Sequence, residues 1–164
     1  MSGPRWHVFA IALFGIMLPL GFGVASGQVV QNETMQRLIG TWRLVSIVNE
    51  KGHVPDDRGQ RPTGLIFYDA SGNMAVQIMP DRDRPRFSRG KATPEEAMAA
   101  LIGYTAYFGT YSVDDSMATV THHRQGNITG LFGEFVRRYE FVGNDKLILQ
   151  SLETKDRLVW ERVK

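Results

Sequence analysis

The sequence predicts an all-β fold, an eight-stranded antiparallel up-and-down barrel with one helix inserted between the third and fourth strands. Two observations carry this prediction. Eight short stretches rich in β-branched and aromatic residues follow one another, and most of the links between them are short and contain Gly, Asn, Asp or Ser. Short links favour pairing of each strand with its neighbour in sequence. Eight such strands form either a sandwich or a barrel, and a closed barrel leaves no exposed edge.

The expected strands are set by these stretches and by the turns between them. The second and third strands flank Asp69-Ala-Ser-Gly-Asn73, a short glycine-bearing connection typical of a hairpin. Further tight turns are expected at residues 114–116, 143–145 and 153–155. The eight expected strands are residues 41–49, 63–68, 73–79, 108–113, 117–123, 134–142, 146–152 and 157–163.

One helix is expected to interrupt the strands. Thr93-Pro94-Glu95-Glu96 forms a capping box with proline at the first helical position, and apolar residues at helical spacing continue to about Ala106. The preceding loop, residues 80–92, is basic but also contains Asp81 and Asp83, so its field is partly cancelled. Such a loop is usually solvated, and an anionic ligand or membrane surface is its alternative partner. Its basic residues are Arg82, Arg84, Arg86, Arg89 and Lys91.

The first 27 residues are predicted to be a cleaved secretory signal peptide, which leaves residues 28–164 as one domain. Arg5 precedes a long apolar run that ends in small residues, the arrangement of a signal peptide with cleavage after Ser26 or Gly27. A retained membrane anchor is the alternative, but glycines and a proline within the run weaken a spanning helix. We therefore expect export to a periplasm or the exterior, with no stable membrane insertion after cleavage.

Composition excludes several classes of function. The chain has 19 Lys and Arg and 17 Asp and Glu, and the predicted signal peptide removes only Arg5, so the remaining domain is almost neutral. A neutral domain without an aromatic and basic strand platform does not indicate nucleic-acid binding. There is no cysteine, hence no disulfide or thiol site. The sequence also lacks a Gly-x-Ser-x-Gly elbow, a phosphate-binding glycine loop and a dinucleotide fingerprint, and no cofactor is expected.

The first and last strands favour closure of the barrel. Side chains alternate along a strand, so an inward Trp42 carries every second residue of its strand inward with it. An arginine on the last strand, Arg162, is expected to stack on Trp42 and close the barrel floor, a cation–π contact worth about 0.5–2 kcal/mol. The sets that share a face are Trp42, Leu44, Ser46 and Val48 on the first strand, and Leu158, Trp160 and Arg162 on the last.

Residues 40–44, Gly-Thr-Trp-Arg-Leu, together with the arginine on the last strand, resemble the lipocalin and fatty-acid-binding (calycin) pattern. Four stretches in order, GTWRLVS, GLIFYDASGNM, YTAYFGTYSV and LVWERV, more specifically resemble the bacterial and fungal lipocalin-like domain family over about residues 36–163. The resemblance implies a barrel with a ligand cavity and floor residues Gly40, Trp42 and Arg162. It implies little about chemistry. The missing disulfide and the helix in mid-barrel depart from true lipocalins, so a retinoid-like ligand is not carried over.

Two tyrosines and a histidine are candidate wall residues. Tyr107 and Tyr111 share one strand face with Gly109 between them, which favours a lined hollow over simple filling of the barrel. His122 and His123 are adjacent and point to opposite faces, so they cannot share one metal ion, and no metal site is expected. We assign His122 to the interior, where it is either a hydrogen-bonded core residue or an acid–base group.

A charged residue is also expected inside the barrel. Phe135, Arg137, Tyr139 and Phe141 share one face of their strand, and a shift by one residue would place Arg138 inside instead. A buried arginine needs an internal carboxylate or an anionic ligand group. A carboxylate-bearing ligand held by Arg137 and the two tyrosines is the sharpest hypothesis. The expected ligand-binding residues are Tyr107, Tyr111, His122, Arg137, Tyr139 and Trp160.

These observations predict an exported barrel that binds a small, mainly apolar or amphipathic ligand in its interior. One alternative is an isomerase or cyclase that uses His122, the tyrosines and Arg137, which requires His122 and a tyrosine hydroxyl to converge on one empty volume. Another is a filled barrel that acts through its outer surface or the basic loop, with an exposed apolar patch as its signature.

Overall fold

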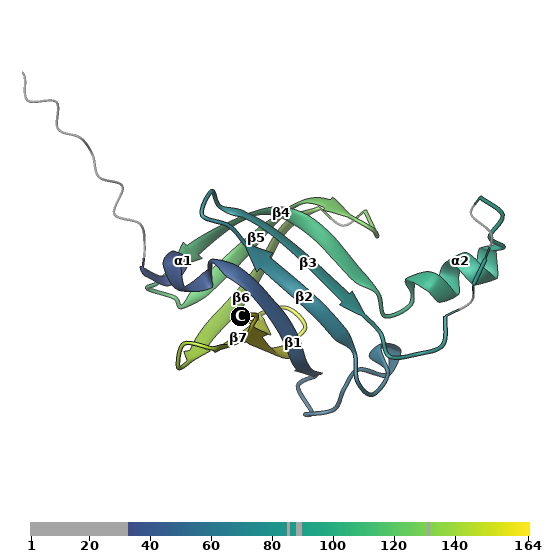
Figure 1. The fold of residues 1–164 in the computed structure, drawn as a ribbon, viewed down its shortest axis with the longest axis horizontal. Coiled ribbons are helices and arrows are strands. Elements are labelled where there is room, and N and C mark those ends of the chain that lie inside the picture. The colour runs from purple at the N-terminus through teal and green to yellow at the C-terminus, as the bar shows by residue number, and fades with distance from the viewer. Residues whose placement is uncertain (1–32, 85, 88–89, 131) are drawn as a thin grey trace, which may run out of the picture. The chain divides into compact units, whose positions relative to one another are not determined.

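The structure, a computed structural model, describes residues 33–84, 86–87, 90–130 and 132–164. The expected signal peptide and Arg89 of the basic loop lie outside these residues. The described chain forms a closed barrel of eight antiparallel strands in the order β1 to β8, as predicted (Figure 1). The strands are β1 (Gly40–Val48), β2 (Thr63–Tyr68), β3 (Asn73–Met79), β4 (Thr105–Asp114), β5 (Thr119–Asn127), β6 (Gly133–Val142), β7 (Lys146–Ser151) and β8 (Arg157–Arg162). The helices are α1 (Glu33–Leu38), the 3-10 turn η1 (Asp56–Arg58) and α2 (Pro94–Leu101).

The two ends of the barrel differ. Short turns join β2 to β3, β4 to β5 and β6 to β7 at one end, which we call the floor because α1 leads into β1 there. The longer connections β1–β2 and β3–β4, together with β5–β6 and β7–β8, lie at the opposite end, which we call the mouth. The indole nitrogen of Trp42 donates to the carbonyl of Leu38 at 2.8 Å, so the end of α1 is fixed to the floor.

Strands β1 and β8 pair and close the barrel. Trp42 lies opposite Arg162, and Leu44 opposite Trp160. A β-bulge between Leu44 and Ser46 then inserts one extra residue, Val45. The prediction that Ser46 and Val48 point inward is therefore wrong, because the bulge reverses the alternation and buries Ile47, which is 3% exposed.

Local side-chain hydrogen bonds set the hairpins at the floor. The Asp69 carboxylate accepts from the backbone N–H groups of Ser71 and Asn73, each at 2.8 Å. In the β4–β5 turn the Asp114 carboxylate accepts from Ser116 in the same way. Ala118 has a φ of 50°, so β5 begins at Thr119 and not at the expected residue 117. The β4–β5 pair is also longer than predicted at the mouth end, where β5 continues to Asn127.

Helix α2 lies between β3 and β4, as predicted, and begins with the expected capping box. Thr93 Oγ1 accepts from the backbone of Glu96 at 3.2 Å, and the Glu96 carboxylate accepts from the backbone of Thr93 at 2.8 Å. The expected end near Ala106 is wrong, because Gly103, with a φ of 71°, stops the helix and approaches the carbonyl of Asp57 so closely that a Cβ would clash. No residue of α2 is buried, so its apolar stripe faces solvent.

The barrel interior is filled from the floor upwards by large side chains. Aromatic rings make up much of this core, and aliphatic side chains of β1, β3 and β7 pack between them. The fully buried large side chains are Trp42, Trp160, Tyr68, Leu38, Ile66, Met74, Leu147, Leu149 and His122. Empty space inside the barrel therefore has to be sought near the mouth.

Candidate ligand-binding site

The floor of the barrel is sealed by Trp42 and Arg162. The Arg162 guanidinium carbon lies 4.0 Å from the centre of the indole ring, within the range of a cation–π contact. Its Nη1 and Nη2 donate to the carbonyls of Ile39 and Arg37 at 2.8 and 2.6 Å. Gly40 has a φ of 128°, and a Cβ there would lie 2.9 Å from Arg162 Nη1. These contacts close the floor to a ligand.

His122 lies in the core, held by two tyrosines. Its Nε2 and Nδ1 are 2.8 Å from the hydroxyls of Tyr68 and Tyr107, respectively. Burial, and next the positive charge of Arg137, lower the pKa of His122 well below its usual value, so the imidazole is neutral. Burial likewise raises the pKa of Tyr68 well above its usual value. A neutral imidazole between two hydroxyls is the hydrogen-bonded core arrangement.

The side chains of the other expected ligand-binding residues, Tyr111, Tyr139 and Trp160, form no hydrogen bond with the His122 ring. The Tyr111 hydroxyl donates to the carbonyl of Asp69 at 2.9 Å, at the floor. The Tyr139 hydroxyl donates to the Asp115 carboxylate at 2.7 Å, also at the floor. Trp160 is buried, and its Nε1 has no hydrogen-bond partner among the described residues. The structure thus brings Tyr107 to His122, and directs the hydroxyls of Tyr111 and Tyr139 to turns at the floor.

A cavity of about 160 Å³ lies at the mouth, and we call it the mouth cavity. Its walls combine apolar side chains from β1, β3, β6 and β8 with charged side chains from β6 and two connections. Among the described residues, its lining includes neither His122 nor a tyrosine. The lining residues are Ile47, Arg58, Ile78, Thr105, Phe135, Arg137, Thr154, Asp156 and Leu158.

Arg137 is the buried charge of this cavity. Its side chain is on the inner face of β6 and the residue is 8% exposed, whereas Arg138 is exposed, which decides between the two alternatives. The guanidinium lies 4.2 Å from the centre of the Phe135 ring. Its Nε and Nη1 are buried without a hydrogen-bond partner among the described residues. Burying charged N–H groups without acceptors is costly, so this site lacks an acceptor that a ligand can provide.

Two further charged residues of the mouth cavity were missed by the sequence analysis. Arg58 comes from η1 in the β1–β2 connection, and its Nη1 donates to the carbonyl of Gly103. Burial lowers the pKa of Arg58, while the carboxylates of Asp57 and Asp156 act in the opposite direction. Asp156, from the β7–β8 connection, accepts from the Thr154 hydroxyl at 3.0 Å. Both residues come from irregular connections, where no periodicity shows which way a side chain points.

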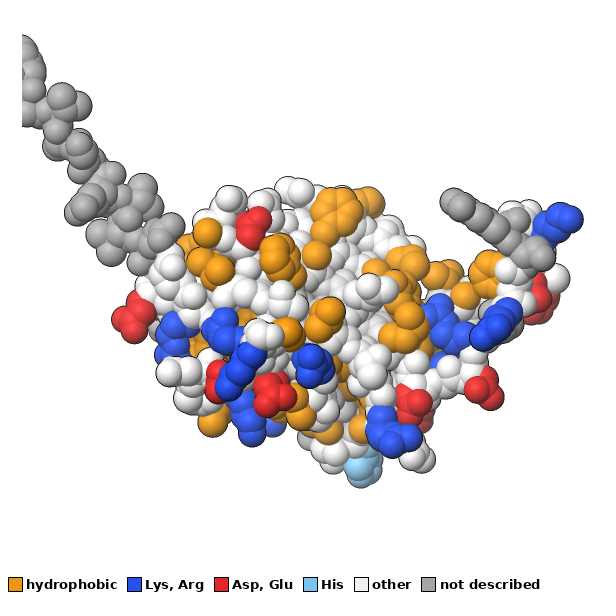
Figure 2. All heavy atoms as spheres, viewed as in Figure 1, with side chains coloured by type: hydrophobic (Ala, Val, Ile, Leu, Met, Phe, Trp, Pro, Cys, Tyr) orange, Lys and Arg blue, Asp and Glu red, His pale blue; other side chains and the backbone are white. Residues whose placement is uncertain are grey.

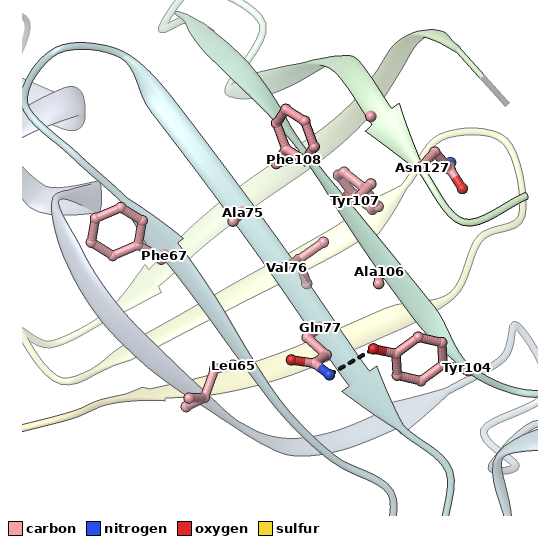
Figure 3. A pocket seen from close by; sticks show the side chains of 11 residues that line it. Leu65, Phe67, Ala75, Val76, Gln77, Tyr104, Ala106, Tyr107, Phe108 and Asn127 are labelled. Carbon is pink, nitrogen blue, oxygen red and sulfur yellow. Dashed lines mark hydrogen bonds between the residues drawn. The ribbon is translucent and has the colours of Figure 1, made fainter. Parts of the chain in front are cut away.

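A larger apolar groove of about 400 Å³ lies on the outer face of β2, β3 and β4 (Figure 3). Leu65, Phe67 and Phe108 project from it to solvent, and Gln77 donates to the Tyr104 hydroxyl at 2.6 Å beside it. These positions alternate with the buried ones, so the groove is separate from the mouth cavity. Figure 2 shows hydrophobic side chains on the face of the barrel in view, and basic, acidic and hydrophobic side chains intermixed around α2.

The described residues hold no group of three or more His, Asp or Glu side chains arranged to bind a metal ion. His123 is on the outer face, where its Nε2 is 2.8 Å from the Ser112 hydroxyl and its Nδ1 is 3.5 Å from the Glu134 carboxylate. Within the part of the chain that the structure describes, no helix has the length and apolar character needed to cross a membrane.

The fold and the mouth cavity together define a small closed antiparallel barrel of the ligand-binding type. The model of the lipocalin-like domain family matches residues 39–163, and the chain belongs to that family. The sequence-based resemblance is thereby confirmed. Among solved structures the chain is similar to a redesigned β-barrel, at 12% identity and a TM-score of 0.43, over 79% of this chain and 95% of that one. No curated protein matches the chain significantly.

Proposed function

We propose that this protein binds a small amphipathic molecule at the mouth of the barrel, with an anionic group against Arg137 and an apolar part among the aliphatic and aromatic walls. The observation that carries the proposal is the buried guanidinium with two N–H groups that lack an acceptor. A carboxylate supplies charge-assisted acceptors for such groups, and these hydrogen bonds are stronger than neutral ones. The family supports a small-ligand-binding barrel in general, and the unpaired guanidinium of Arg137 supports the anionic group of the ligand.

The apolar part of the ligand has a defined place in this proposal. Ile47, Ile78, Phe135 and Leu158 line the mouth cavity around Arg137. Ligand sites usually combine such an apolar surface with a few polar groups that fix orientation. Burial of the apolar part contributes affinity, and the guanidinium contributes selectivity for acids.

We revise the expected set of carboxylate-binding residues, which was Arg137, Tyr107 and Tyr111. The hydroxyl of Tyr107 is engaged with His122, and that of Tyr111 with the backbone of Asp69. Arg58 takes their place as the second polar group, because it lines the same cavity as Arg137.

Catalysis by His122 has less support than binding. A general base must reach the proton that it abstracts. Both ring nitrogens of His122 are occupied by tyrosine hydroxyls, and the mouth cavity does not reach this residue. One observation supports the alternative that the protein acts through its outer surface, namely the apolar groove beside Leu65 and Phe67. That groove lacks a counterpart to the unpaired buried charge of Arg137 among its described lining residues, so we favour the mouth cavity.

We also propose that the protein is exported to a periplasm or secreted. This part rests on the sequence of residues 1–27, with its charged start, apolar run and small-residue end. Mass determination of the protein purified from its own host tests it directly. A chain that begins at about residue 27 or 28 supports export, and an intact N-terminus contradicts it.

Native mass spectrometry of the protein from its own host tests the binding function. We expect a retained small acid, lost in Arg137→Met and kept in Arg138→Met. The second variant is a matched control, because Arg138 is the exposed neighbour on the same strand. Retention of the same molecule by Arg137→Met, or retention of a neutral molecule only, would contradict the anionic site. Circular dichroism of both variants establishes that the barrel is intact.

A further inference from the structure

We infer that the mouth cavity selects a singly charged ligand, a monocarboxylate whose buried body is about the size of one aromatic ring, and that Asp156 excludes doubly charged acids. The inference rests on the proposed function and deepens it. It follows from the charges that line the cavity and from the volume that they enclose.

The lining carries an unequal set of charges. Arg58 and Arg137 are two guanidinium groups, and Asp156 is one carboxylate. Guanidinium groups remain protonated at neutral pH, so the lining has a net charge of one positive unit. Asp57 acts on Arg58 more strongly than Asp156 does, but its exposed side chain lies outside the lining and does not enter this count. One carboxylate on the ligand therefore neutralises the cavity.

Asp156 influences Arg58 electrostatically but, among the described residues, forms no ion pair with the guanidinium group of Arg58 or Arg137. Burial lowers the pKa of Arg58, and the negative charge of Asp156, on the same cavity lining, partly opposes this lowering. In the described part of the chain, no ion pair within 4.0 Å joins Asp156 to either arginine. The Thr154 hydroxyl holds one of its oxygens at 3.0 Å. Nε and Nη1 of Arg137 therefore still lack acceptors, and a ligand carboxylate would supply them.

A second negative charge on the ligand would exceed the net positive charge of the lining. It would lie in the same small cavity as the Asp156 carboxylate, where like charges repel and solvent screening is weak. The negative charge of Asp156 thus turns a site with two arginines into a site for one anion. Specificity of this kind depends on a repulsive group as much as on attractive ones.

The volume of the cavity limits the body of the ligand. The cavity measures about 160 Å³. An engineered apolar cavity of about 150 Å³ in another protein holds benzene, so one ring is the appropriate scale. The apolar walls from Ile47, Ile78 and Leu158 suit such a body, and any longer tail has to leave through the mouth.

Two probes of nearly equal size and different charge test the inference. Phthalate carries two carboxylates at neutral pH, and phthalamate carries one carboxylate and one amide. We expect the wild-type protein to bind phthalamate about tenfold more tightly than phthalate, measured by calorimetry. Asp156→Asn should remove most of this preference by strengthening phthalate binding, because the amide keeps the hydrogen bond with Thr154 but not the charge. Glu153→Gln is the matched control, since it removes a carboxylate from the same connection outside the cavity lining and should leave the preference unchanged.

The outcomes separate the two proposals. Equal affinity of the wild-type protein for both probes, or an unchanged preference in Asp156→Asn, overturns charge selection while the anion site stands. Loss of the preference in Glu153→Gln as well would overturn the role of Asp156 in particular. If neither probe nor benzoate binds, and the Nε–H resonance of Arg137 does not move in an NMR titration, the anion site itself is overturned together with the inference.

Discussion

The guanidinium of Arg137 lies 4.2 Å from the centre of the Phe135 ring, on the same inner face of β6, while its Nε and Nη1 have no acceptor among the described residues. An aromatic face compensates part of the charge but does not accept hydrogen bonds as an oxygen does. A buried charge without an acceptor is costly, and such a residue is expected where binding, and not stability, has selected it.

We expect Arg137→Met to increase stability and abolish acid binding. The methionine fills similar space and removes an unpaired buried charge, so the free energy of unfolding of the unliganded protein should rise by about 1 kcal/mol or more. Affinity for benzoate should fall strongly, and affinity for benzamide should change less. Denaturant unfolding and calorimetry measure both effects.

The exposed neighbour provides the control for this prediction. Arg138→Met should change stability by no more than about 0.5 kcal/mol and leave benzoate binding intact. A loss of stability of several kcal/mol in Arg137→Met would mean that the guanidinium is satisfied in the folded protein.

Arg137 also shows where sequence-based prediction succeeds. Strand β6 pairs with β5 and β7 in an uninterrupted register, so alternation from Phe135 to Phe141 correctly placed Arg137 inside. The same rule failed on β1, because the bulge at Val45 exchanges the inner and outer faces beyond Leu44. A bulge depends on pairing with β8, which the β1 sequence alone does not reveal.

The other charged residues of the mouth cavity could not be predicted from the sequence, for a different reason. Arg58 and Asp156 lie on connections 98 positions apart in the numbering, and only barrel closure brings them to one cavity. Helix α2 ends early at Gly103, whose φ of 71° is typical of a glycine just past a helix end, so this boundary had a local signal that the sequence analysis overlooked. The capping box and the Asp69 hairpin were predictable because their hydrogen bonds join residues close in sequence.

We expect Trp42→Ala to lower the free energy of unfolding by about 3–5 kcal/mol, because it removes a fully buried indole and the ring under Arg162. Val45→Ala is the matched control on the same strand, since Val45 is 55% exposed at the bulge. Its effect should stay within about 0.5 kcal/mol. Near-wild-type stability of Trp42→Ala in denaturant unfolding would contradict the sealed floor.

The floor also depends on Gly40. Its φ of 128° is strained for any other residue, and a Cβ would lie 2.9 Å from Arg162 Nη1. We expect Gly40→Ala to cost about 2–3 kcal/mol of stability. Gly52→Ala separates the two causes, because Gly52 has a φ of 80° with nothing within 4 Å of an added Cβ. Equal thermal destabilisation by the two substitutions would show that backbone strain alone, and not the contact with Arg162, accounts for the effect.

The final prediction concerns pH. The pKa of His122 is lowered well below its usual value by burial, so the unfolded chain takes up a proton at a pH where the folded protein does not. The stability contribution of the neutral imidazole is therefore present above the unfolded pKa, near 6.5, and declines as the pH falls below it. The slope should approach about 1.4 kcal/mol per pH unit. In His122→Gln this component should be absent, although the variant starts from lower stability because one of the two tyrosine hydrogen bonds is lost or weakened.

Denaturant unfolding between pH 7 and pH 5 measures the difference in slope between the wild-type protein and His122→Gln. The comparison cancels carboxylates such as Asp69 and Asp114, whose lowered pKa values act at lower pH in both proteins. His123→Gln leaves the buried imidazole in place and should keep the steeper dependence. Parallel pH profiles for wild type and His122→Gln would mean that the imidazole gains a proton in the folded barrel. Such a proton would restore the acid–base alternative, because a histidine that titrates between two tyrosines is able to transfer it.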